Sequence, residues 1–207
     1  MSVQDFMPKD DWVVCVDTGA LSLAHGVSID DDFPPELADR IVVLPRTPLL
    51  ELACRYKQLV VYVVITQQQA GVLRTLVYQR QGKQEGEQRL AGKFSVGVGG
   101  HVEVRDLADE VDPVDTARPY VGSDTMWQVA TNAALRELDE ELLWPQLGPG
   151  ELKPDLSMFT DLSAWMYTPQ DQVGRAHIGL VFYCKLPPEH ETPVYGPGQQ
   201  TLWLSEL

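Results

Sequence analysis

The sequence predicts an α/β (α+β) fold, in which helices pack on the faces of a mixed β-sheet. Residues 59–65 are almost entirely apolar and rich in β-branched side chains, which is typical of a strand buried on both faces. Similar runs lie on both sides of it, and one long segment ending at Leu143 has helical spacing. The 207 residues, 44% of them hydrophobic and 22% charged, suffice for one domain with a sizeable core.

The N-terminal residues 1–57 are expected to form an extension that packs on this core. Its apolar runs are short and are separated by an Asp- and Pro-rich loop. Its predicted elements are a strand at 12–16, a helical turn at 36–40, a strand at 41–44 and a helical segment at 49–56.

The central region predicts a hairpin followed by a glycine turn. Residues 59–65 and 72–80 are strand-like and are joined through Gly71, so they are expected to pair. Residues 94–98 form a further strand that runs into Gly99 and Gly100. Two adjacent glycines at a strand end allow a tight turn and a close approach of the backbone to a ligand.

A long helix is predicted in the second half of the chain. It is expected to begin near Ser123 or Asp124, both good N-caps, and to run to Leu143, before Pro145. Residues 105–122, which precede it, are acidic and contain prolines, so they are expected to form an exposed excursion. The remaining strands are predicted at 157–167, 178–185 and 201–204.

The end of this helix carries a cluster of charges. At about 100° per residue, Glu137, Glu140 and Glu141 share one arc, and Arg136 flanks it. A separate arc carries the leucines that suit a core, Leu135, Leu138 and Leu142. Carboxylates at this spacing repel one another, and a hard cation such as Mg²⁺ would turn that repulsion into binding. The alternative for these residues alone is a solvated helix face.

Composition excludes several classes of function. A net charge of −14 argues against binding polymeric nucleic acid, although a small phosphorylated ligand remains compatible if a metal supplies positive charge. No signal peptide and no membrane-spanning run is evident, so a cytoplasmic protein without membrane contact is expected. Three widely spaced cysteines, Cys15, Cys54 and Cys184, are expected to be small buried residues rather than disulfide or zinc ligands.

The glycine turn and the acidic helix together resemble the Nudix box of the Nudix hydrolases, G-x5-E-x7-R-E-U-x-E-E-x-G-U, with U a bulky aliphatic residue. Gly100 is similar to the first glycine, and residues 136–141 match R-E-U-x-E-E at every fixed position. About 22 residues are inserted between them relative to the pattern. Asp106 stands at the position of the first glutamate, and Leu143 replaces the later glycine. The resemblance covers residues 58–207 and implies a Nudix-like α/β/α sandwich with an inserted loop at about 105–122.

The resemblance implies a Mg²⁺-dependent hydrolase, with Mn²⁺ as a second metal, that cleaves the diphosphate (pyrophosphate) linkage of a nucleoside diphosphate joined to another moiety. By resemblance, Glu137, Glu140 and Glu141 hold the metal, with the carbonyl of Gly100 as a backbone ligand. The general base is Glu137 or Glu140, and the residues do not separate the two. Arg136 is expected to orient a helix glutamate through a charge-assisted hydrogen bond.

Two residues near the glycine turn are candidates for substrate binding. His101 would contact phosphate, although a histidine in this position is often structural. Glu103 would be an outer ligand of the metal or of water, or else a solvated residue at a strand end. The expected partner is a small, nucleotide-like phosphorylated substrate, and a homodimer is also considered.

Two other functions stay open at this point. The interrupted box suggests a non-catalytic Nudix-like module that senses a nucleotide. An isoprenyl diphosphate isomerase of the same family would need a cysteine and a glutamate in its pocket. Neither Cys54 nor Cys184 has a local motif for that role, so this alternative ranks last.

Overall fold

The computed structural model describes most of the predicted core. The described residues are 12–19, 23, 26–29, 34–46, 55–80, 91–107, 123–144, 155–170, 172–189, 192–195 and 201–205. Contacts divide the chain into two compact units. Unit 1 comprises Met1–Val61, Gly100–Ala134 and Leu162–Val181, and unit 2 comprises Tyr62–Gly99, Leu135–Asp161 and Phe182–Leu207.

Most of the described strands belong to one sheet. Along its main path they follow the order β11-β5-β4-β9-β8-β2, while β1 pairs with β3 and β4, and β6 pairs with β5. The strands of this sheet are β1 (Trp12–Asp17), β2 (Gly26–Ile29), β3 (Ile41–Pro45), β4 (Tyr56–Gln69), β5 (Val72–Gln79), β6 (Phe94–Val96), β8 (Phe159–Tyr167), β9 (His177–Leu186) and β11 (Thr201–Ser205). The described α-helices are α1 (Pro35–Ala38), α2 (Ser123–Glu141) and α3 (Gln172–Ala176). The predicted α/β (α+β) class is confirmed.

In unit 1 the N-terminal strand β1 joins β3 to the beginning of β4. β1 is antiparallel to β3 and also to β4, where Cys15 is the partner of Gln58. Its apolar residues are buried, so the strands predicted at 12–16 and 41–44 form as expected, and α1 covers part of the helical turn predicted at 36–40. Of the helix predicted at 49–56, residues 49–54 lie outside the described part of the chain. Tyr56, at its predicted end, begins β4 instead. β2, which pairs with β8, was not predicted.

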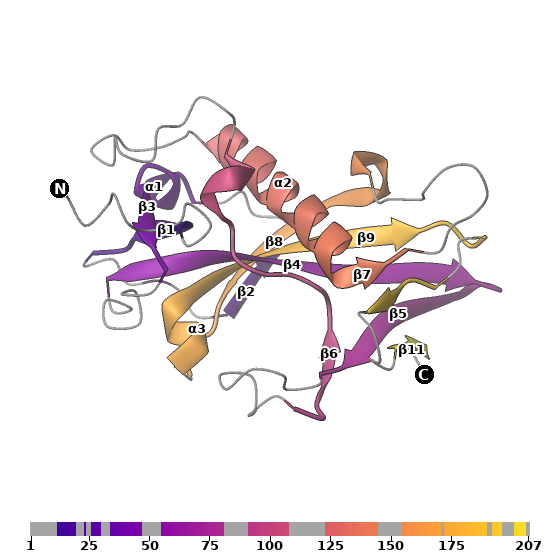
Figure 1. Cartoon of the computed structure of the whole chain (residues 1–207). Helices are drawn as coiled ribbons and strands as arrows, with labels where there is room; N and C mark the ends of the chain where they lie inside the picture. Colours follow the sequence, from indigo (N-terminus) through magenta and orange to yellow (C-terminus); the bar gives the residue numbers. More distant parts are fainter. Residues whose placement is uncertain are drawn as a thin grey trace. The chain divides into compact units, whose positions relative to one another are not determined.

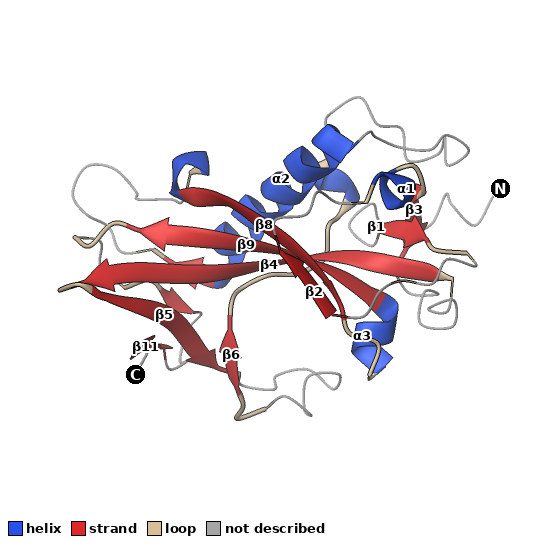
Figure 2. Cartoon of the chain, turned by 180° about the vertical axis from the view of Figure 1, so that it is seen from behind, coloured by secondary structure: helices blue, strands red, loops and turns tan. Residues whose placement is uncertain are grey.

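In unit 2 the predicted hairpin forms between β4 and β5. Gln69 pairs with Val72 across a two-residue turn in which both Ala70 (φ 51°) and Gly71 (φ 82°) are left-handed. Such turns match the right-handed twist of the flanking strands, which explains the tight connection. β11 and β6 also pair antiparallel with β5, and Val77 is the partner of both Leu202 and Val96 (Figures 1 and 2).

Helix α2 ends two residues earlier than predicted. Glu141 is its last residue, and the next two form the short strand β7 (Leu142–Leu143), which pairs with β10 (Val194–Tyr195). The indole Nε1 of Trp144 donates to the carbonyl oxygen of Leu138 at 3.1 Å. A helix leaves its last four carbonyls without partners, and the indole satisfies one of them. The helix therefore ends without the glycine that the box pattern places there.

Two residues near the start of the predicted excursion are buried, not exposed. Residues Val104–Asp106 form a 3-10 turn, and both Asp106 and Leu107 are buried. The Asp106 carboxylate accepts the backbone N–H of Glu103 at 2.8 Å, and its carbonyl oxygen accepts from the Asn132 side chain at 3.1 Å. These two bonds hold the turn within unit 1. Residues 108–122 lie outside the described part of the chain.

The described cysteines are interior residues, as expected. Cys15 and Cys184 are buried, and burial raises the pKa of each thiol to about 12. Cys54 lies outside the described ranges. Among the helices that the structure describes, none is long and apolar enough to cross a membrane.

Gly97 has a left-handed backbone conformation and leaves no room for a side chain. Gly97, between β6 and the bridge that pairs Val63 with Val98, has φ 103°. A Cβ atom there would lie 2.5 Å from the Cε1 atom of Tyr62. The absence of a side chain therefore lets the Tyr62 ring lie directly against the backbone of residue 97.

Leu138 is the first test of this packing. The Leu138→Ala variant is expected to lose about 2–5 kcal/mol of unfolding free energy, because this side chain is fully buried on α2. The matched control is Leu143→Ala, at a residue that is 56% exposed, with an expected change below about 1 kcal/mol. Urea unfolding followed by circular dichroism measures both. Equal losses would contradict the assignment of the core face.

Gly97 provides the second test. Gly97→Ala and Gly71→Ala both place a side chain at a left-handed φ, which costs about 1–3 kcal/mol. At Gly71 nothing lies within 4 Å of the added Cβ, whereas at Gly97 it meets Tyr62. We therefore expect Gly97→Ala to be less stable than Gly71→Ala by about 1–3 kcal/mol in the same urea experiment. Equal stabilities would show that the ring does not pack there.

Candidate active site

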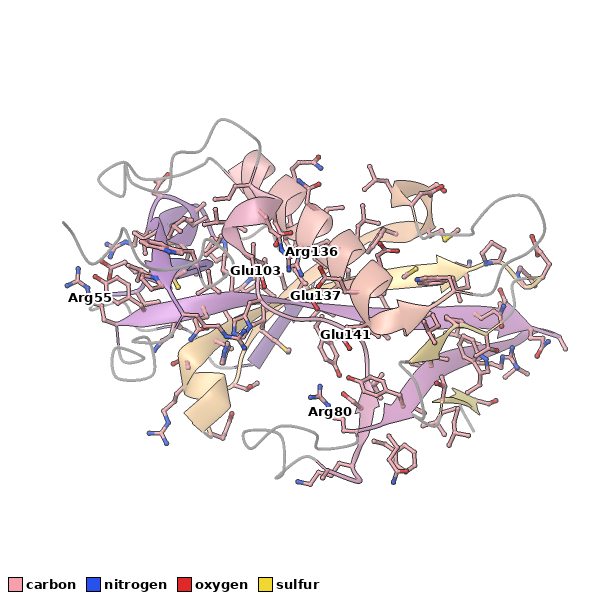
Figure 3. The ribbon with its side chains drawn as sticks, viewed as in Figure 1. Arg55, Arg80, Glu103, Arg136, Glu137 and Glu141 are labelled. Carbon is pink, nitrogen blue, oxygen red and sulfur yellow. The ribbon has the colours of Figure 1, made fainter. Side chains whose placement is uncertain are left out.

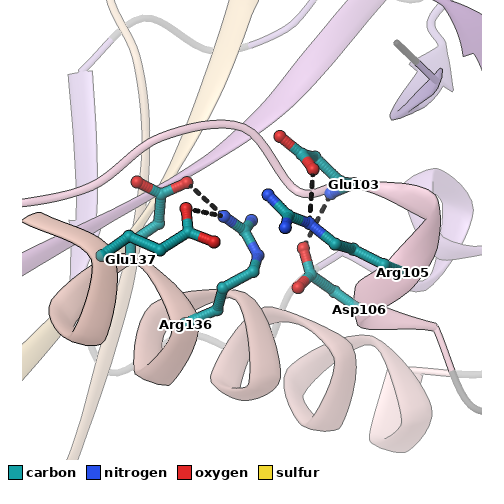
Figure 4. A network of polar contacts seen from close by, with 6 residues as sticks. Glu103, Arg105, Asp106, Arg136 and Glu137 are labelled. Carbon is teal, nitrogen blue, oxygen red and sulfur yellow. Dashed lines mark hydrogen bonds and ion pairs between the residues drawn. The ribbon is translucent and has the colours of Figure 1, made fainter. Parts of the chain in front are cut away.

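The C-terminal half of α2, in unit 2, brings three of the predicted site residues together. Arg136 Nη1 donates to Glu137 Oε1 at 2.8 Å and to Glu140 Oε2 at 3.2 Å (Figure 4). The side chains of Arg136 and Glu137 are 14% and 9% exposed, whereas that of Glu140 is 45% exposed. Arg136 thus links a buried carboxylate to an exposed one, which agrees with the orienting role predicted for it.

The helix buries Glu137 because of its position beside the core arc. Leu138 and Leu142 are buried, and the small residues Ala133 and Ala134 are fully buried one turn earlier. Glu137 lies next to these buried residues on the helix surface and is therefore withdrawn from water. Glu141 is half-buried. Figure 3 shows Arg136, Glu137 and Glu141 along this part of the helix.

The positive charge of Arg136 does not fully offset the burial of the Glu137 carboxylate and the charges of its neighbours. Burial raises the pKa of its carboxyl group, the hydrogen bond and charge of Arg136 lower it, and the charges of Glu140 and Glu141 raise it again. The net effect is a raised pKa, so one guanidinium does not balance the desolvated carboxylate and its neighbours. Additional positive charge at this position would stabilise the ionised form.

The carboxylates have the right chemistry for a hard cation, but they are not gathered around a common point. No group of three or more His, Cys, Asp or Glu residues that could hold a metal ion occurs among the residues that the structure describes. Arg136 engages Glu137 and Glu140, so a cation would have to compete with its guanidinium. The donor set and the raised pKa of Glu137 fit Mg²⁺, and metal binding by Glu137, Glu140 and Glu141 stays a prediction.

The predicted turn does not form at Gly99 and Gly100. Gly100 belongs to unit 1, and Gly99 ends the preceding segment of unit 2. The carbonyl oxygen of Gly100 accepts the N–H of Val61 at 2.9 Å, and the N–H of Val102 donates to Leu59 at 2.9 Å. The segment therefore runs alongside β4, and neither glycine is among the described residues with positive φ. A carbonyl oxygen has two lone pairs, so the role of Gly100 as a backbone metal ligand stays a prediction.

His101 is paired with a second histidine that sequence reasoning missed. Its Nε2 atom lies 3.3 Å from Nε2 of His177, and the two ring centroids are 5.3 Å apart. In this contact one nitrogen must carry the proton and the other must accept it. His177 begins β9 and is 76 residues away along the chain, so no local motif could have indicated the pair.

Glu103 belongs to a polar network in unit 1. Its Oε2 atom accepts from Arg105 Nε at 2.7 Å, and its backbone N–H donates to Asp106 (Figure 4). The Glu103 side chain is only 15% exposed, so this carboxylate is held in place rather than solvated. Asp106, at the nominal position of the first box glutamate, uses its carboxylate to hold this turn.

The chain is similar to solved structures of other proteins. No protein-family model and no curated protein matches the sequence. The crystal structure of Tm1382, whose own assignment as a Nudix hydrolase is provisional, is similar with a TM-score of 0.56 and 17% identity, covering 94% of this chain and 85% of that one.

Two further solved structures are similar at lower scores. The Ap4A hydrolase of C. elegans has a TM-score of 0.38 and 16% identity, covering 72% of this chain and 80% of its own. A Nudix hydrolase of Alicyclobacillus acidocaldarius has a TM-score of 0.42 and 18% identity, covering 71% and 78%. The similarity to Tm1382 shows that the chain has a Nudix-like fold, as predicted.

Glu137 should make the stability of the metal-free protein depend on pH. The pKa of its carboxyl group in the folded chain is raised above the usual 4.5 of an unfolded chain. Between the unfolded and the folded pKa, the folded chain holds a proton that the unfolded chain has released. The free energy of unfolding must therefore fall as pH rises through this window. In EDTA, Glu137→Gln is expected to lose less stability than wild type as the pH rises above 4.5 in urea titrations. Identical slopes would show that burial does not control this carboxyl group.

Proposed function

We propose that the chain is a Mg²⁺-dependent hydrolase that cleaves the diphosphate linkage of a nucleoside diphosphate joined to another moiety. The observation that carries this proposal is the acidic end of α2, where Arg136 holds a buried and an exposed glutamate. The Nudix-like fold supports it, since the same residues form the R-E-U-x-E-E sequence of the box. The net charge of −14 favours a small substrate over a nucleic acid polymer.

In the proposed reaction Glu137, Glu140 and Glu141 would hold Mg²⁺, with Mn²⁺ as an alternative. A bound divalent ion neutralises phosphate oxygens and lowers the pKa of coordinated water. Arg136 keeps two of the carboxylates in fixed rotamers through its hydrogen bonds. The raised pKa of Glu137 supports it as the proton acceptor, because general bases work best with a pKa near the working pH.

A screen for hydrolysis tests the proposal. Nucleoside triphosphates, ADP-ribose, dinucleoside polyphosphates and coenzyme A are incubated with and without Mg²⁺, and phosphate is measured before and after phosphatase treatment. Glu140→Gln and Glu141→Gln are expected to lower kcat at least about 100-fold, because each removes a carboxylate charge from the metal site. Asp139→Asn changes the same charge on the same helix, outside the predicted ligand set, and should stay within about twofold of wild type.

A second candidate is a non-catalytic module that senses a nucleotide. The pairing of Glu137 and Glu140 with Arg136, together with the lack of a gathered metal group among the described residues, favours it. If no compound is hydrolysed with either metal but one binds tightly, this candidate replaces the hydrolase. If hydrolysis occurs and Glu140→Gln keeps full activity, the assignment of the site to α2 is wrong.

A further inference from the structure

Several of the described arginines hold a carboxylate in an ion pair. Arg55 pairs with Asp17, Arg105 with Glu103 and Arg136 with Glu137. Arg80, directly after β5, makes no ion pair within the described residues, although the chain has 30 acidic residues and 16 Lys and Arg. Its side chain is also half-buried, so it is not simply extended into water.

The contacts that Arg80 does make are weak. Its Nη2 atom is 3.5 Å from Ser95 Oγ, at the limit of a hydrogen bond, and its guanidinium lies 5.8 Å from the centroid of the Tyr78 ring. A guanidinium carries five N–H donors in a planar fork. Within the described part of the chain, these two contacts leave most of its N–H donors without a strong acceptor. The oxygens of an anionic group match the planar arrangement of these donors well.

The described residues around Arg80 add further hydrogen-bond donors, and none of those in contact with its side chain is a carboxylate. The Tyr62 hydroxyl lies 3.4 Å from Ser95 Oγ, and the Tyr62 ring is fixed against Gly97. Burial, more than any other effect, raises the pKa of Tyr62, so its hydroxyl keeps its proton at neutral pH. We call Tyr62, Tyr78, Arg80 and Ser95 the Arg80 cluster. All four belong to unit 2, from the strands β4, β5 and β6 and the residue after β5.

The cluster shares unit 2 with the acidic end of α2. Figure 3 shows Arg80 below the end of the helix that carries Glu141. The unit therefore presents carboxylates suited to a cation and, separately, a group of donors suited to an anion. A phosphorylated substrate whose diphosphate is held through a metal would have use for both.

We infer that the Arg80 cluster binds a phosphate group of the substrate. The inference rests on the proposed function for the identity of the ligand. It adds that one phosphate of the substrate is held by the protein itself, without a metal. The guanidinium would bind two phosphate oxygens, and the hydroxyls of Ser95 and Tyr62 would donate to the same group. Arg80 would thereby determine which phosphorylated compounds are accepted.

The test uses inorganic phosphate and the full chain in EDTA, so that a metal site cannot contribute. Isothermal titration at constant ionic strength compares wild type with Arg80→Gln, Arg80→Lys and Lys93→Gln. We expect Arg80→Gln to weaken phosphate binding at least about tenfold. Arg80→Lys should weaken it less, because lysine keeps the positive charge but lacks the planar N–H donors of the guanidinium. Lys93 is an exposed cation next to β6, and Lys93→Gln should stay within about twofold of wild type.

Three results would overturn the inference. These are the absence of saturable phosphate binding by wild type, equal affinities of wild type and Arg80→Gln, and an equal loss in Lys93→Gln, which would indicate general electrostatics. Circular dichroism and thermal unfolding of each variant check the fold. Arg80→Lys retains a cation beside Tyr78, so it still reports on the fork if Arg80→Gln proves unstable.

The hydrolysis screen separates this inference from the proposed function. If a compound is hydrolysed, Arg80→Gln should raise its KM about tenfold or more with kcat within about threefold. Hydrolysis with an unchanged KM and unchanged phosphate affinity would reject the inference and leave the hydrolase standing. Phosphate binding that depends on Arg80, without hydrolysis of any compound, would reject the hydrolase and leave the anion site standing.

Discussion

The candidate site depends on the ion pair between Arg136 and Glu137 at the buried edge of α2. The 100° step of the helix that buries Leu138 also withdraws Glu137 from water. A carboxylate in that position needs compensation, and Arg136 supplies one hydrogen bond and one positive charge. Because the same guanidinium also reaches Glu140, the core packing of the helix fixes the acidic cluster as well. Chemistry and packing are therefore coupled through adjacent residues of one helix.

The end of the helix shows how the fold tolerates a departure from the box pattern. Where the pattern has a glycine, this chain has Leu143, which takes part in the short strand β7. The indole of Trp144 folds back to a carbonyl in the last turn of α2. A side-chain donor and a strand pairing thus replace the left-handed cap that glycine would provide. The carboxylates precede this change, so the helix can end differently without altering their spacing.

Charge is distributed unevenly over a strongly acidic chain. Ion pairs use Arg55, Arg105 and Arg136 to hold particular carboxylates, two of them in the candidate regions. Arg80 is placed among hydroxyl donors, where a protein anion is missing from its described surroundings. Under the proposed function, local donors of this kind would attract an anionic substrate, against which the net charge of the chain works.

The sequence by itself determined the features that depend on local periodicity. The β-branched run at 59–65, the hairpin turn at Gly71 and the arcs of α2 follow from spacings of two and 3.6 residues, so the fold class and the acidic cluster could be predicted. Tertiary structure alone decided the rest. The pairing of His101 with His177, the bond between Asp106 and Asn132 and the left-handed Gly97 beside Tyr62 depend on partners far along the chain. No local pattern encodes such contacts, because they arise only when separate strands and turns pack together.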